Sequence, residues 1–152
     1  MTGRRRVPVV LQVAATDCGP SALAMLLAAH GRAVPVSYLR ARLDVGRDGL
    51  SLRDLRDEAQ QHGLRCRAIA LPALRVDATR LGELPMPLLA HWNGDHYLVV
   101  ERTGRHGVDV VDPAVGRRRL SPAQFCAGTT GTPNLMEAET DRALVEAADR
   151  LV

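Results

Sequence analysis

Cys18 is the residue best suited to covalent chemistry in this sequence. It stands in the run Thr16-Asp17-Cys18-Gly19-Pro20, directly before an apolar stretch with a helical period. A cysteine attacks as the thiolate, and the unpaired N–H groups at a helix N-terminus stabilise that anion. Proline suits the first turn of such a helix. The pattern therefore predicts a thiol nucleophile at a helix N-terminus, and the alternative is an inert cysteine that begins a core helix.

Gln12, six residues before this cysteine, is a candidate for stabilising the oxyanion that forms when a thiolate attacks a carbonyl. A side-chain amide and the backbone N–H of the nucleophile can donate to an oxyanion together. Gln12 interrupts the otherwise apolar segment from Val7 to Ala15. A polar residue there is either exposed at the surface or buried for a specific reason, so plain exposure is the alternative.

His96 and Asp112 form a candidate base and orienting acid. If residues 96–101 and 107–112 form an antiparallel hairpin centred on Gly104, His96 faces Asp112 directly. An imidazole held by a carboxylate keeps one orientation and remains a competent base. A structural His–Asp hydrogen bond is the alternative, and a register shift of one residue would separate the pair. The same sheet face would carry four apolar residues, which are Leu98, Val100, Val108 and Val110.

The elements that must position these side chains follow from periodicity and from capping and turn residues. Ser51 is expected to cap a helix that Gly63 ends, and Asn93-Gly94 is a hairpin signal. Helices precede an antiparallel sheet, which indicates an α+β architecture. The predicted helices span residues 20–30, 37–43, 51–62 and 140–152, with a helical turn at 78–81 and a short helix opened by a capping box at Ser121. The predicted strands span residues 64–69, 87–92, 96–101, 107–112 and 117–120.

Composition limits the class of protein. A chain of 152 residues with 46% hydrophobic residues fits one globular domain. A net charge of +3 is too small to indicate nucleic-acid binding, so arginine runs such as 117–119 are expected to be solvated strand ends. The apolar runs are shorter than the roughly 20 residues that cross a bilayer. The odd number of cysteines and their spacing fit neither a disulfide framework nor a zinc site, which favours a reducing cytoplasmic setting with Cys66 and Cys126 as packing residues.

Five short segments occur in a fixed order along the chain: Leu11-Gln12, Asp17 to Pro20, Gly46 to Gly49, His96 to Val100 and Asp112 to Gly116. This ordered set resembles the bacteriocin-processing, double-glycine leader peptidases, a family of papain-like cysteine peptidases, from about residue 8 to about residue 136. The resemblance implies a papain-like fold, in which N-terminal helices pack on a C-terminal antiparallel sheet. The peptidase domain would span residues 1–136. Residues 137–152 would form a C-terminal helix, as a connector toward a transporter membrane domain or as a plain packing helix.

The resemblance also assigns roles. It implies that Cys18 is the nucleophile, His96 the general base and acid, Asp112 the residue that orients the imidazole, and Gln12 part of the oxyanion hole. It implies cleavage of a ribosomally made precursor peptide after a Gly-Gly or Gly-Ala site in a narrow cleft. No metal, nucleotide or other cofactor is expected in this domain.

The expected partners are the precursor peptide and, if the chain is an excised domain, the transmembrane and nucleotide-binding domains of an ABC transporter. The chain has no lysine and so no Walker motif, which leaves an excised domain or a stand-alone peptidase. An excised domain would work at the cytoplasmic face of the bacterial membrane. A non-cleaving leader-binding module and a papain-like acyl transferase are the alternative functions. Nucleic acid is not an expected partner.

Overall fold

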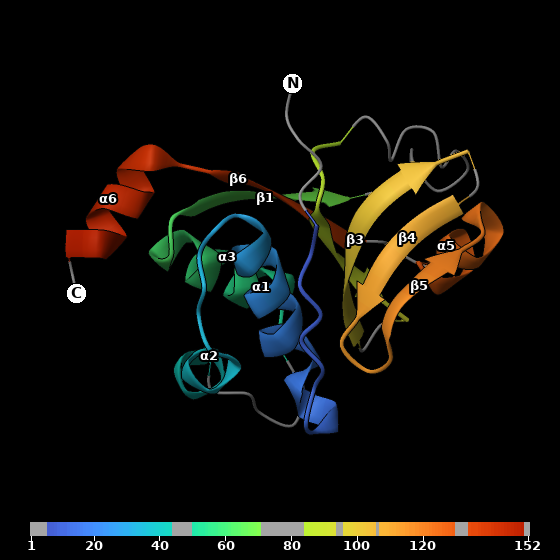
Figure 1. Cartoon of the computed structure of the whole chain (residues 1–152), viewed down its shortest axis with the longest axis horizontal. Coiled ribbons are helices and arrows are strands. Elements are labelled where there is room, and N and C mark those ends of the chain that lie inside the picture. Colours follow the sequence, from blue (N-terminus) through green and yellow to red (C-terminus); the bar gives the residue numbers. More distant parts are fainter. Residues whose placement is uncertain are drawn as a thin grey trace.

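A computed structural model of the chain describes residues 6–43, 50–70, 84–93, 96–105, 107–129 and 134–150. The helical turn expected at 78–81 and the segment 46–49 lie outside these ranges. Within them, helices come first and strands of one antiparallel sheet follow, as predicted, with one helix before the last strand and another after it (Figure 1). The helical elements are η1 (Ala15–Asp17), α1 (Cys18–Ala29), α2 (Val36–Leu43), α3 (Leu52–Gln61), α5 (Pro122–Gly128) and α6 (Arg142–Arg150). The strands are β1 (Leu64–Ala70), β2 (Leu88–Trp92), β3 (His96–Gly104), β4 (Gly107–Asp112), β5 (Gly116–Leu120) and β6 (Asn134–Thr140).

The helix ends follow the sequence signals. The Ser51 hydroxyl accepts a hydrogen bond from the Asp54 N–H at 3.1 Å, and the Asp54 carboxylate accepts one from the Ser51 N–H at 3.0 Å. This capping box starts α3 where it was predicted. Gly63 then ends the helix with a φ of +99°, a conformation that favours glycine. Ser121 starts α5 with the same kind of capping box.

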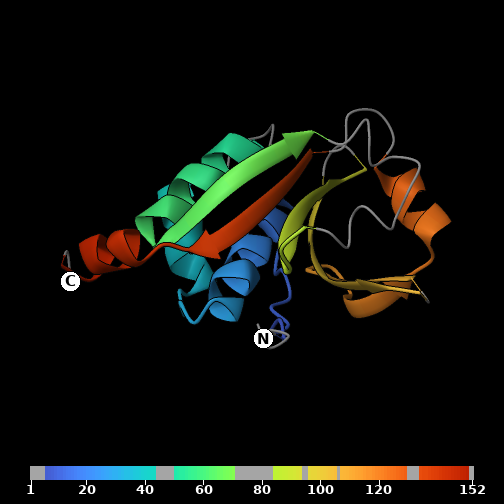
Figure 2. The ribbon, with the colours of Figure 1, turned by 90° about the horizontal axis from the view of Figure 1, so that it is seen from above.

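The six strands form one sheet in the order β1-β6-β2-β3-β4-β5. Helices α1, α2 and α3 cover one face, and α5 lies against the opposite face near β4 and β5 (Figure 2). Neighbouring residues of β3 therefore enter different cores: Val99 packs in the core under α1, whereas Leu98 and Val100 pack in the core under α5. This confirms the α+β class and the apolar face predicted for the hairpin.

Strand β6 was not predicted, although it lies in the sheet between β1 and β2. Its residues include Leu, Met, Ala and Glu, which are not strong strand formers, so its conformation comes from pairing on both edges. The boundary expected between residues 136 and 137 falls inside this strand. Thr140 is the last residue of β6, and α6 begins at Arg142 rather than at Thr140. Among the described helices, none has both the length and the apolar character required to cross a bilayer.

Candidate active site

Cys18 is the first residue of α1, as predicted, and 7% of its surface is exposed. The turn η1 delivers the chain to this position, and the whole first turn of α1 is buried. The following residue, Gly19, has Leu50 packed against it: a Cβ at Gly19 would lie 3.1 Å from the Leu50 Cδ1. The absence of a side chain at position 19 therefore lets the thiol-bearing end of the helix approach its neighbours closely.

His96 lies between Asp112 and the thiol of Cys18. Its Nε2 is 2.7 Å from the Asp112 Oδ1, and its side chain also hydrogen-bonds with Cys18. Because Asp112 occupies Nε2, Nδ1 is the ring nitrogen left for the sulfur. The hydrogen bond to Asp112 and then the one to Cys18 raise the pKa of His96 to about 9 against the opposing effect of burial. The imidazole is therefore protonated at neutral pH, in the form that pairs with a thiolate.

The register that brings these side chains together differs from the predicted one. Val100 pairs with Val110 and Val99 with Val111, and a bulge lies between Val100 and Arg102. Asp112 is therefore diagonal to His96 rather than directly opposite, which corrects the predicted pairing. The shift is two residues, so both side chains keep the same face of the sheet. A diagonal neighbour is still within reach of an imidazole and a carboxylate.

The Asp112 carboxylate has further partners that fix its position and charge. Its Oδ1 accepts a hydrogen bond from the Ala114 N–H at 2.8 Å, and Arg118 Nη2 lies 4.0 Å from its Oδ2. Burial alone would raise the pKa of Asp112, but the hydrogen bonds from His96 and Ala114 and the charges of His96 and Arg118 lower it overall. The Asp112 carboxylate is thus ionised at neutral pH, where it pairs with the protonated His96.

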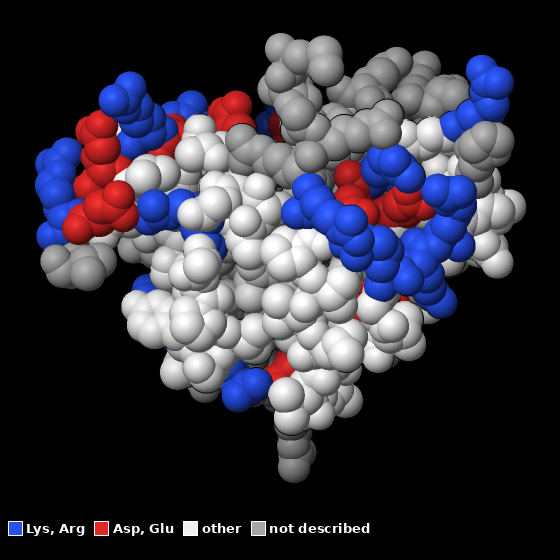
Figure 3. All heavy atoms as spheres, viewed as in Figure 1, with Lys and Arg blue, Asp and Glu red and all other residues white. Residues whose placement is uncertain are grey.

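Arg118 was not singled out in the sequence, because it belongs to the run 117–119 that was expected to be solvated. Its neighbours point to the other face of β5, where arginines gather over β3–β5 with acidic groups among them (Figure 3). There Arg117 pairs with Glu101 at 2.9 Å and Arg119 with Asp109 at 2.7 Å. The alternation of side chains along β5 places only the middle arginine near the site.

Gln12 is tied to the same corner of the molecule by its backbone. Its N–H donates to the carbonyl of Pro113, the residue after Asp112, at 2.8 Å. The side chain is half-buried, and its Oε1 is buried without a hydrogen-bond partner in the described part of the chain. The structure therefore anchors Gln12 beside the residue that follows the acid, and it does not show the plain surface exposure that was the alternative. Its neighbours Leu11 and Val13 are exposed.

Asp17 occupies the N-cap position of α1, where an aspartate commonly caps a helix, but its side chain makes no capping hydrogen bond. Its carboxylate accepts no hydrogen bond from the first turn of the helix. It accepts one from the Ala14 N–H at 3.2 Å and two from Arg40, at 2.9 and 2.8 Å. The sequence could not indicate this pairing, because the two charged residues lie 23 positions apart in different helices.

The other cysteines lie outside this arrangement. Cys66 is buried in the core, and burial raises the pKa of its thiol to about 12, which suits the predicted packing role. Cys126 is half-buried on α5. In the described ranges, no group of three or more His, Cys, Asp or Glu side chains is placed to hold a metal ion.

Comparison with known proteins identifies the family of the chain. Residues 6–140 match the Peptidase C39 family, so the chain belongs to that family, and it is a cysteine peptidase domain. It is 33% identical over 131 residues to the probable microcin-H47 secretion/processing ATP-binding protein of Escherichia coli; the match covers 86% of this chain and 18% of that protein. It is 30% identical over 139 residues to a probable functional amyloid protease of Pseudomonas aeruginosa, covering 84% of this chain and 59% of that protein.

The chain thus spans about a fifth of the length of the secretion proteins it matches. Among solved structures, it superimposes on a double glycine motif protease from an AMS/PCAT transporter, in complex with the leader peptide, with a TM-score of 0.79. That match has 28% identity and covers 92% of this chain and 96% of the other. The peptidase domain of Streptococcus ComA has the same fold, with a TM-score of 0.72. The predicted papain-like fold and family are confirmed.

Proposed function

We propose that this domain removes the leader from a ribosomally made precursor peptide by cutting after a double-glycine-type site. The observation that carries the proposal is His96, held by Asp112 at 2.7 Å and hydrogen-bonded to the Cys18 thiol. This arrangement supplies a nucleophile, a base and acid, and an orienting group. The secretion/processing names of the transporter-like relatives, and the leader peptide in the structure of the AMS/PCAT transporter protease, support the choice of substrate.

In the proposed reaction, the Cys18 thiolate attacks the carbonyl carbon of the second small residue. The C–S bond forms as the carbonyl π electrons move to oxygen, where the Cys18 N–H and the Gln12 amide donate hydrogen bonds. The oxyanion collapses, the C–N bond breaks, and His96 gives its proton to the leaving amine, which frees the mature peptide. His96 then takes a proton from water, and the hydroxide adds to the carbonyl carbon of the thioester. The C–S bond breaks, which returns Cys18 as the thiolate and releases the leader as a free carboxylate.

The proposed setting is the cytoplasmic face of a bacterial membrane, with the domain joined to or acting beside an ABC transporter that exports the mature peptide. Support comes from the microcin-H47 and colicin V secretion/processing proteins, both ATP-binding proteins by name. Helix α6 would then lead toward the transporter, because it leaves the sheet at the C-terminal end of the described chain. A leader-binding module without cleavage is less consistent with this chain, since all four expected groups are present.

The test is cleavage of a synthetic precursor peptide with a Gly-Gly or Gly-Ala site, followed by mass spectrometry. We expect Cys18→Ala to abolish cleavage, a loss of at least about 1,000-fold, while the circular dichroism and the affinity for the leader stay as in the wild type. Cys126→Ala is the matched control and should cleave normally, because this cysteine lies on α5. Retained cleavage by Cys18→Ala would refute the assignment, and a product with a new amide bond would indicate an acyl transferase.

A further inference from the structure

The turn before the nucleophile is closed by a buried carboxylate. Asp17 is 2% exposed, and its N–H donates to the Ala14 carbonyl at 3.0 Å. In return its carboxylate accepts a hydrogen bond from the Ala14 N–H at 3.2 Å. These two hydrogen bonds fix the conformation of the short segment that joins Gln12 to Cys18.

The same carboxylate is bound by a guanidinium from another helix. Arg40 of α2 donates from Nε to Oδ1 at 2.9 Å and from Nη2 to Oδ2 at 2.8 Å. A forked contact of this kind sets direction as well as distance. The N-terminal side of the segment is held separately by the hydrogen bond from Gln12 to Pro113. The segment is thus anchored at one end on the β4–β5 turn and at the other end on α2.

We propose that the Asp17–Arg40 ion pair is a positioning device for the reaction, because it fixes the Ala14–Asp17 turn and thereby places Gln12 relative to Cys18. The inference rests on the peptidase activity proposed above and adds two residues to it. In this role neither residue needs to touch the substrate. Both act through the residues that form the nucleophile and the oxyanion hole, where an error of about 1 Å reduces the rate by about 100-fold.

Charge gives the pair a second effect on the site. Burial alone would raise the pKa of Asp17, but the hydrogen bond and charge of Arg40, together with the Ala14 N–H, lower it overall, so the residue is an anion directly beside the nucleophile. An unpaired carboxylate there would oppose formation of a thiolate at Cys18. The guanidinium of Arg40 compensates the negative charge of Asp17, because it binds both oxygens of that carboxylate. Removal of Arg40 would therefore loosen the turn and also make the thiolate less favourable.

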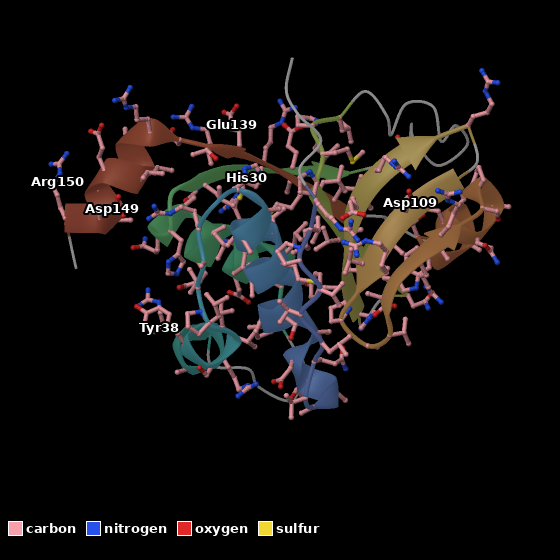
Figure 4. All side chains as sticks on the ribbon, in the orientation of Figure 1. His30, Tyr38, Asp109, Glu139, Asp149 and Arg150 are labelled. Carbon is pink, nitrogen blue, oxygen red and sulfur yellow. The ribbon has the colours of Figure 1, made fainter. Side chains whose placement is uncertain are left out.

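The chain provides a matched control two residues further along α2. Arg42 donates to Glu58 of α3 at 2.6 Å and is 42% exposed, whereas Arg40 is 43% exposed. The two acceptors are buried to a similar degree, with side chains 3% and 7% exposed for Asp17 and Glu58. Arg42 also lies 5.7 Å from the ring centroid of Tyr38, which Figure 4 places on α2. Loss of Arg42 thus removes a similar ion pair that does not involve the nucleophile's turn.

The experiment compares Arg40→Ala with Arg42→Ala in the whole chain. It measures kcat and KM on the precursor peptide, the midpoint of thermal unfolding, and the rate at which iodoacetamide alkylates Cys18 without peptide, followed by mass spectrometry. Both variants should unfold at lower temperature. Arg40→Ala should lower kcat about tenfold or more, with KM within about twofold of the wild type, and should slow the alkylation. Arg42→Ala should keep the wild-type kcat and alkylation rate.

Arg40→Lys keeps the charge but not the forked contact, so its kcat should lie between those of the wild type and Arg40→Ala. If Arg40→Ala does not unfold cooperatively, the test rests on Arg40→Lys. A wild-type kcat for Arg40→Lys would then overturn the inference. Equal kcat values for Arg40→Ala and Arg42→Ala, or a change in KM alone, would also overturn it. The alkylation needs no substrate: if the wild type fails to cut the peptide while Arg40→Ala alone slows alkylation, the choice of substrate is wrong and the positioning role stands.

Discussion

At the scale of residues, the site combines one protonated imidazole with two hydrogen-bonding partners, the Asp112 carboxylate and the Cys18 side chain. The pKa of His96 is raised to about 9, mostly by its hydrogen bond with Asp112 and to a smaller extent by its hydrogen bond with Cys18. In a thiolate–imidazolium pair, activity is lost when the imidazolium loses its proton. The upper limit of the pH range for activity is therefore set by His96, and that limit depends on the charge of Asp112.

Asp112→Asn tests this dependence. The amide oxygen can still accept the hydrogen bond from His96, and papain-like peptidases with a Cys-His-Asn set show that an amide can orient the imidazole. We therefore expect kcat/KM to fall only about tenfold at neutral pH, because orientation is kept while the negative charge is lost. The alkaline limb of the kcat/KM profile should move down from about pH 9 toward the ordinary range of histidine, since the charge that raised the pKa is gone.

Asp112→Ala is the companion variant, and it should lose more activity because neither orientation nor charge remains. The readout is kcat/KM between pH 5 and 10 for the three proteins, a window set by the pKa of histidine in its free and raised forms. An alkaline limb that stays at the wild-type pH in Asp112→Asn would show that Asp112 does not control the charge of His96. Equal losses for the two variants would show that an amide cannot orient the ring here.

The sequence identified the residues of the candidate site better than their surroundings. Cys18 at a helix N-terminus and the shared face of His96 and Asp112 follow from rules on helix ends and strand alternation. The register was two residues out beside the site, because the hairpin turns between Gly104 and Gly107, which pair with each other, and is not centred on Gly104. The contacts of Asp112 with Arg118 and of Asp17 with Arg40 depend on tertiary structure and could not be found from spacing.

At the scale of elements, glycines with positive φ decide where helices end and what can pack behind them. Gly63 ends α3 at a φ of +99°, and Gly31 follows α1 at a φ of +78°. A Cβ added at Gly63 would lie 2.5 Å from the Val145 Cγ2 and 3.2 Å from the Val145 Cα of α6. A Cβ at Gly31 would have no atom within 4 Å. The two positions thus share a backbone conformation but differ in packing.

Gly31→Ala and Gly63→Ala separate these effects. Gly31→Ala should lower the free energy of unfolding by about 1–2 kcal/mol, which is the cost of a left-handed conformation for alanine. Gly63→Ala should cost more, because α6 must also move away from the new methyl group. Urea denaturation measures both. In a chain that ends at residue 141, the excess cost at Gly63 should disappear, and an excess that persists there would show that α6 is not its cause.

The elements with strong local signals were predicted correctly, and the one with a weak signal was missed. Ser51 and Ser121 begin helices through hydrogen bonds to residues three positions ahead, so four residues of sequence contain the whole motif. Strand β6 has no such motif. Its Met136 pairs with Ala68 of β1 and Leu89 of β2, far away in the sequence, and these long-range pairs determine its conformation.

At the scale of the whole molecule, the last two elements contribute unequally to the fold. Strand β6 joins β1 to the rest of the sheet, with pairs along its whole length from Asn134 to Thr140. Its final residue is also tied to α1, because His30 Nδ1 lies 3.2 Å from the Thr140 Oγ1. Helix α6 has no fully buried residue and extends beyond the edge of the sheet in Figure 2. Figure 4 shows Asp149 and Arg150 on this outlying helix, far from η1.

Two truncations measure this difference. A chain that ends at residue 141 keeps the entire sheet and loses the contact of Val145 with Gly63 and the ion pair of Arg32 with Asp149. We expect it to unfold cooperatively, with a loss of about 1–3 kcal/mol for one or two half-buried side chains, and to cleave the peptide with the wild-type kcat. The measurements are urea denaturation followed by circular dichroism, and peptide cleavage.

A chain that ends at residue 136 lacks the half of β6 that pairs with Leu64–Arg67. It also lacks the buried residue Ala138, so the core residues that surround Ala138 would be exposed to water. Strand β1 would then keep only three of its seven partners, which are Asn134, Leu135 and Met136. This chain should show no cooperative transition, because one end of the sheet and the core beneath α3 lose their closing strand. A cooperative, active protein that ends at residue 136 would mean that the second half of β6 is dispensable and that the peptidase domain is complete at that residue.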